Sequence, residues 1–107
     1  MNNIKEDKSK ETMILTDEEC RKIMIKDHIN KVARHFKGNF YIILGTALNT
    51  ETNEEMVIYR GLYGNCTQYA RPINNFIEQC TQEQFNEYGQ KYRFEFVKLP
   101  DETKDVY

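Results

Sequence analysis

The side chains best suited to ligand chemistry gather in one stretch, residues 56–72. This window contains no Asp or Glu, and it interleaves Arg60 and Arg71 with Tyr59, Tyr63 and Tyr69. Arginine offers paired N–H donors that match a phosphate or a carboxylate, and tyrosine offers a ring face for stacking together with a polar hydroxyl. The pattern therefore predicts a surface that binds a small ligand that is anionic, aromatic or both.

Arg60 allows two interpretations. Strand alternation places it on the apolar side of its segment, on the face opposite to Tyr59 and Tyr63. Burying an arginine there is costly unless it is paired, so one interpretation is an internal salt bridge to Glu51 or Glu54. The other is a guanidinium that points into a ligand pocket.

The remaining candidates have structural alternatives as well. Arg71 either contacts a ligand or donates to loop carbonyls, and the three tyrosines either form a partly solvated surface or pack inside a barrel. His35 and Lys37 flank a tight turn at Gly38, where they are either solvated turn residues or ligand contacts.

No motif of a known catalytic centre is present. The sequence contains no nucleophile elbow, phosphate-binding loop, zinc-protease helix or paired CxxC. The sequence has three cysteines, Cys20, Cys66 and Cys80, and their spacings match neither a disulfide framework nor a metal knuckle. We therefore expect reduced thiols. A nucleophilic pair of Cys66 with His35 stays open as an alternative. We expect a protein that is not an enzyme and has no cofactor and no metal.

A helix precedes the candidate residues. Thr16 and Glu19 form a capping box, which predicts a helix start, and Ile25, Ile29 and Val32 follow at helical spacing. We therefore predict a flexible N-terminal tail over 1–15 and a helix over 16–32. The helix either docks on the following domain or pairs with a second copy of the chain.

The period of the apolar pattern changes to two from Phe36 onward. A central strand over 40–47, a polar turn over 50–55 and a strand over 56–60 predict an antiparallel hairpin. Arg71 and Pro72 end any central strand, one helical turn surrounds Phe76, residues 81–90 are a polar connection, and a last strand covers 92–97. Short strands with frequent turns favour a mainly β domain, a small barrel over 33–99, followed by a C-terminal tail over 100–107.

The charge balance limits the partners. Lys and Arg number 15 and Asp and Glu 17 in 107 residues, for a net charge of −2. Residues 36–107 hold seven basic and ten acidic side chains, so no general field attracts nucleic acid or an anionic membrane. The apolar runs are far shorter than the ~20 residues of a transmembrane helix, and no signal peptide is recognisable. We expect a cytoplasmic protein.

A series of motifs occurs in order between residues 33 and 96. They are Arg34-His35-Phe36-Lys37-Gly38-Asn39, Val57-Ile58-Tyr59-Arg60, Leu62-Tyr63-Gly64, Arg71-Pro72, Phe76 and Arg93-Phe94. With these motifs the chain resembles the bacterial domain-of-unknown-function family 1653, and the resemblance implies an SH3-like β-barrel but does not indicate which activity to expect. This chain has Tyr69 where the family usually has tryptophan.

Three functions follow as hypotheses. The first is a non-catalytic binding module for a small anionic or aromatic ligand, such as a nucleotide, or for a peptide. The second is a small barrel that binds RNA or single-stranded nucleic acid, which the acidic balance disfavours. The third is a structural protein that dimerises through residues 16–32. The predicted ligand-binding residues are His35, Lys37, Tyr59, Arg60, Tyr63, Tyr69 and Arg71.

Overall fold

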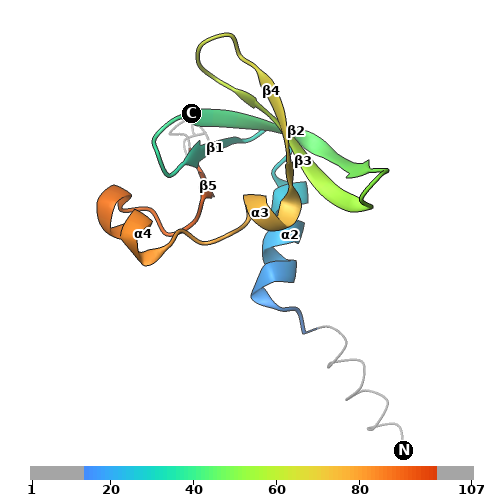
Figure 1. Cartoon of the computed structure of the whole chain (residues 1–107), viewed down its shortest axis with the longest axis horizontal. Coiled ribbons are helices and arrows are strands. Elements are labelled where there is room, and N and C mark those ends of the chain that lie inside the picture. The colour runs from blue at the N-terminus through green and yellow to red at the C-terminus, as the bar shows by residue number, and fades with distance from the viewer. Residues whose placement is uncertain (1–13, 99–107) are drawn as a thin grey trace, which may run out of the picture.

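The computed structural model describes residues 14–98, so most of the tail predicted over 1–15 and all of that over 100–107 lie outside the described residues. Within these residues a helix is followed by four strands, two short helices and a last strand (Figure 1). They are α2 (Asp17–Asp27), β1 (Val32–His35), β2 (Phe40–Asn49), β3 (Glu54–Gly61), β4 (Gln68–Pro72), α3 (Ile73–Phe76), α4 (Gln82–Tyr88) and β5 (Phe94–Phe96).

The strands form one antiparallel sheet in the order β4-β3-β2-β1-β5. The predicted hairpin is confirmed as β2 and β3, and its pairs run from Tyr41 with Gly61 to Asn49 with Glu54. A register shift between Ile43 and Gly45 interrupts this ladder; such bulges bend a sheet. The chain is thus mainly β, and β4 and β5 are the two edges of the sheet.

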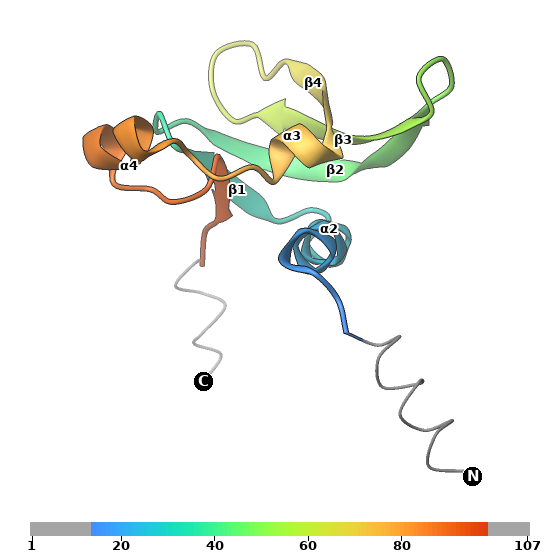
Figure 2. The same ribbon diagram turned by 60° about the horizontal axis from the view of Figure 1, so that its bottom comes forward.

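The core lies on one side of the sheet, which we call the inner face. Strand alternation directs Ala33, Ile43, Val57, Tyr59 and Phe94 to this face, where all are buried. Helix α3 lies against β3 and β4, and α2 contacts α3 and β2 (Figure 2). The helices complete the core with four buried side chains, Ile25, Ile73, Phe76 and Ile77.

The other side of the sheet, the outer face, follows from the same alternation. Its cross-strand neighbours are Val32 with Ile42, Ile42 with Arg60, and Arg60 with Gln68. This face also carries Phe40, Met56 and Ile58, and all these side chains are partly or largely exposed.

Helix α2 begins as predicted, since Thr16 and Glu19 form both bonds of the capping box at 3.0 Å. It ends at Asp27, so the predicted end at residue 32 is wrong. Asn30 adopts a φ of 69°, its N–H donates to the Ile43 carbonyl at 2.7 Å, and Val32 opens β1. Pairing with β2 therefore replaces the last helical turn that the apolar spacing indicated.

The predicted connection over 81–90 is also wrong, because it contains α4. Thr81 and Gln84 form a second capping box, and Gly89 ends the helix with a φ of 77°. Tyr88 reaches back to Phe36, with ring centroids 5.2 Å apart. The capping signal was present in the sequence, but too few apolar residues accompanied it to indicate a helix.

None of the helices within residues 14–98 is long and apolar enough to cross a membrane.

Candidate ligand-binding site

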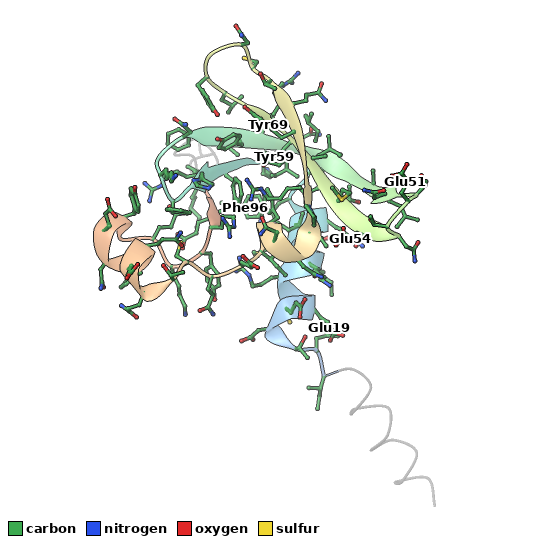
Figure 3. All side chains as sticks on the ribbon, viewed as in Figure 1. Glu19, Glu51, Glu54, Tyr59, Tyr69 and Phe96 are labelled. Carbon is green, nitrogen blue, oxygen red and sulfur yellow. The ribbon has the colours of Figure 1, made fainter. Side chains whose placement is uncertain are left out.

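Four tyrosines form a ring cluster on the inner face, which we call the tyrosine cluster. Tyr41 is its centre, with its ring centroid 5.4 Å from Tyr59, 5.6 Å from Tyr63 and 6.2 Å from Tyr69, all edge to face. Tyr59 and Tyr69 are 5.4 Å apart on neighbouring strands (Figure 3). Edge-to-face rings place the positive edge of one against the negative face of the next, which favours this packing.

The strand register assembles the tyrosine cluster. Tyr59 pairs with Tyr69, and Tyr41 pairs with Gly61 in the same sheet. Tyr63 then folds back over Gly61, where a Cβ would lie only 2.9 Å from the tyrosine ring. The absence of a side chain at position 61 therefore allows the fourth ring to join the other three.

The outer part of the cluster faces solvent. Tyr59 is buried, with 4% of its surface exposed, whereas Tyr63 and Tyr69 are 41% and 38% exposed. The Tyr41 and Tyr63 hydroxyls are 3.0 Å apart, and this hydrogen bond is the first cause that raises the pKa of Tyr63. The Tyr63 hydroxyl in turn raises the pKa of Tyr69. The hydroxyls of Tyr63 and Tyr69 therefore stay protonated at neutral pH and serve as neutral donors and acceptors.

Arg71 lies beside the tyrosine cluster and is held by two side chains. Its Nε donates to the Tyr59 hydroxyl at 2.9 Å, and its Nη1 donates to Oδ1 of Asn75 at 2.5 Å. Its Cζ lies 5.7 Å from the ring centroid of Phe94. No carboxylate pairs with this guanidinium within residues 14–98, and no described group accepts from its Nη2. The interpretation that Arg71 donates to loop carbonyls is therefore wrong, because its partners are side chains.

His35 completes the site as a neutral donor. Its Nδ1 accepts the backbone N–H of Lys37 at 3.1 Å, which leaves the proton of the neutral ring on Nε2. Its ring stacks on Phe36 at 4.4 Å and meets the edge of Phe94 at 5.0 Å. Burial first, and then the charge of Arg71, lower the pKa of His35 from 6.5 to about 4. Lys37 contributes its backbone to this arrangement, and its side chain is exposed.

Arg60, one of the predicted ligand-binding residues, does not join the site. It lies on the outer face between Ile42 and Gln68. The predicted salt bridge is absent too, since Glu51 and Glu54 lie at the hairpin tip, far from Tyr59 (Figure 3), and Arg60 forms no ion pair in the described part of the chain.

Three residues of the site were not predicted, namely Tyr41, Asn75 and Phe94. Tyr41 and Phe94 belong to strands whose sequence alternation was recognised, but the pairing that brings these strands together was not evident from it. Asn75 belongs to α3, which follows β4 directly and so places the amide four residues after Arg71.

A buried glutamine supports the strands that carry His35 and Phe94. Gln90 is 2% exposed, and its Nε2 donates to the carbonyls of Arg34 and Tyr92, each at 2.9 Å. Its Oε1 accepts from Nε of Arg34 at 2.9 Å. The side chain therefore ties β1 to the segment that leads into β5.

Metal binding and thiol chemistry have little support in the described residues. Across residues 14–98 no group of three His, Cys, Asp or Glu side chains could hold a metal ion. Cys20, Cys66 and Cys80 are free thiols, and burial raises the pKa of Cys80.

Comparison with known proteins gives one structural match and one family match. No curated protein matches the chain. A crystal structure of a DUF1653 protein from Bordetella bronchiseptica is 32% identical, covers 68% of this chain and 91% of its own, and superposes with a TM-score of 0.54. The family model described as protein of unknown function (DUF1653) matches residues 31–96. The chain therefore belongs to the DUF1653 family.

Proposed function

We propose that this domain is a non-catalytic binding module whose ligand is small, anionic and aromatic, in the manner of a nucleotide. The observation that carries the proposal is the guanidinium of Arg71, which is partly buried among rings and lacks a carboxylate partner in the described residues. A partly desolvated charge without a counter-charge is costly to maintain. An anionic ligand group would offset that cost on binding.

The partners of Arg71 support the proposal because they fix its orientation. Tyr59 and Asn75 take one N–H each from Nε and Nη1, and the N–H groups of Nη2 remain available. A guanidinium that is oriented before binding loses less side-chain entropy when it engages a phosphate or a carboxylate.

The rings supply the second half of the recognition. Tyr63 and Tyr69 are partly exposed and can stack on a ring of the ligand, an interaction worth ~1–3 kcal/mol per base in other proteins. The Nε2 proton of neutral His35 adds a donor without adding charge. We therefore expect the charged contact and the ring contact to contribute separately to affinity.

A peptide with an acidic group next to an aromatic side chain would satisfy the same contacts, and it is the alternative ligand for this site. RNA or single-stranded nucleic acid is disfavoured, because residues 36–107 carry seven basic and ten acidic side chains and phosphate contacts need several cations.

Two further hypotheses remain proposals. One is that the five strands form an SH3-like barrel, as the family resemblance implies. The other is that residues 16–32 pair two copies of the chain. For this second hypothesis the available surface is the exposed side of α2, where Ile23 is 46% exposed, because Ile25 is used in the core. A mass measurement of the full chain and of an Ile23→Lys variant tests it, and equal monomeric masses would reject it.

The proposed function is tested by calorimetric titration of the full chain. The four probes are adenosine monophosphate, adenosine, inorganic phosphate and a dinucleotide of single-stranded RNA. We expect the monophosphate to bind more tightly than either adenosine or phosphate. Arg71→Gln should weaken the monophosphate about tenfold or more, since a charged hydrogen bond contributes ~1.5–3 kcal/mol. Tyr69→Ala should weaken adenosine and the monophosphate equally.

Arg60→Gln is the matched control, because it removes the same charge from the other face of the sheet and should leave the monophosphate affinity unchanged. Equal losses in Arg71→Gln and Arg60→Gln would show a nonspecific effect of net charge and contradict the proposal. Failure of all four probes and of an acidic aromatic dipeptide such as Asp-Phe to bind would reject it. Stronger binding of the RNA dinucleotide than of the monophosphate would favour the nucleic-acid hypothesis instead.

A further inference from the structure

The outer face of the sheet is an apolar surface built in rows. One row runs across three strands through Val32, Ile42 and Arg60, and the next pairs Gly45 with Ile58 and Ile58 with Ala70. A third row joins Ala47, Met56 and Pro72, and at the other end Leu62 donates its N–H to the carbonyl of Phe40 at 2.9 Å.

The described helices leave this face open. The helical core residues Ile25, Ile73, Phe76 and Ile77 pack with Ile43 and Val57 of the inner face. On the outer face, Phe40 is 43% exposed and Leu62 is 46% exposed. Contiguous apolar side chains that remain accessible on one face are typical of a surface that contacts another macromolecule.

Arg60 is the charge at the middle of this surface. It lies between Ile42 and Gln68 and two residues after Ile58 on β3, and it forms neither an ion pair nor a side-chain hydrogen bond in the described part of the chain. A guanidinium surrounded by apolar groups favours a carboxylate in an interface, where the fork geometry and partial desolvation strengthen the contact. Arginine is also enriched at the centres of protein interfaces.

A second copy of the chain fits this surface poorly. A twofold pairing of outer faces would bring the two Arg60 side chains together, and like charges disfavour such an arrangement. Glu95, which pairs with Arg34 at the other end of this face, already accepts from the backbone N–H groups of Lys91 and Tyr92 at 3.2 Å. Its Oε2 is therefore already engaged within the chain and is less available to a partner copy.

We propose that the outer face is a docking surface for a protein partner that presents a short segment of apolar side chains around one Asp or Glu. The carboxylate meets Arg60, and the apolar side chains cover Ile42, Ile58 and Phe40. This surface is separate from the tyrosine cluster, so the two can be occupied at the same time.

The test selects binders from a random 16-residue peptide library displayed on phage against the full chain, and then measures synthetic copies of the enriched peptides by fluorescence anisotropy. We expect enriched peptides that combine apolar residues with Asp or Glu. Arg60→Glu should weaken them about tenfold or more, and selection against this variant should enrich Lys or Arg at the acidic position. Lys22→Gln, which removes a partly exposed charge on α2 that pairs with Glu18, is the control and should change affinity less than twofold.

Leu62→Ser is a second variant that keeps the test valid if Arg60→Glu lowers stability, because Leu62 is largely exposed and its backbone bond to Phe40 is retained. It should also weaken the peptides. The proposal is overturned if no peptides that combine apolar and acidic residues are enriched. It is also overturned if the NMR amide signals that change on peptide binding belong to the tyrosine cluster. It is equally overturned if the wild-type chain forms a dimer that Arg60→Glu dissociates, since the surface would then be a self-interface. Because the nucleotide titration uses another face, either result can fail alone.

Discussion

Acidification tests the environment of His35 directly. The imidazole lies against Phe36 and Phe94, and the charges of Arg71, Arg93 and Lys37 surround it. Protonation would place a fourth positive charge in this region, and no described carboxylate pairs with the ring. The fold therefore tolerates the neutral form and opposes the charged form.

The direction and the size of the pH effect on stability follow from the pKa of His35 in the folded and in the unfolded chain. The pKa of His35 is about 4 in the folded protein and 6.5 for a free side chain, so the unfolded chain binds the proton first as the pH falls. The contribution of His35 to the free energy of unfolding is complete above pH 6.5, declines between pH 6.5 and 4, and is constant below that. The full difference corresponds to ~3 kcal/mol, and solvent screening of this half-buried ring reduces the expected loss to ~1–2 kcal/mol.

Urea unfolding at pH 7.5, 6.5, 5.5 and 4.5 measures this loss in the wild type and in His35→Gln. Carboxylates titrate alike in both proteins, so the difference between the two stability curves isolates the imidazole. We expect the wild type to lose ~1–2 kcal/mol more than His35→Gln across this range. Parallel curves, or an NMR proton resonance assigned to His35 by its loss in His35→Gln that titrates near 6.5, would refute the reasoning.

Three further predictions concern the residues that support the site. Gln90→Leu leaves two backbone carbonyls without their donor, and should lower the free energy of unfolding by ~2–4 kcal/mol in urea; a loss below ~1 kcal/mol would contradict a supporting role. Gly61→Ala should displace the Tyr63 ring and weaken the binding of adenosine monophosphate while changing the melting temperature little. An unchanged affinity would show that this ring does not contact the ligand. Thr16→Ala removes one bond of the capping box and should cost ~1 kcal/mol of stability without altering ligand affinity; a simultaneous loss of affinity would show that α2 positions the site.

Local patterns in the sequence determined several elements of this protein. The alternation in β2 and β3, with a polar turn between them, predicted the hairpin because adjacent strands pair through short connections. The Thr16 capping box predicted the start of α2 for a similar reason, since both partners lie within one helical turn. Strand alternation also separated Arg60 from Tyr59 correctly.

The tertiary structure decided which of these elements meet. Pairing of β1 with β5 brings His35 to Phe94, and pairing of β1 with β2 ends α2 at Asp27. The register of β2, β3 and β4 makes Tyr41 the centre of the rings. The same sheet leaves Arg60 without the carboxylate of Glu51 or Glu54, which was one of its two predicted interpretations. Such contacts join segments far apart in the chain, and their energy depends on strand order and packing, which the period of any single segment does not encode.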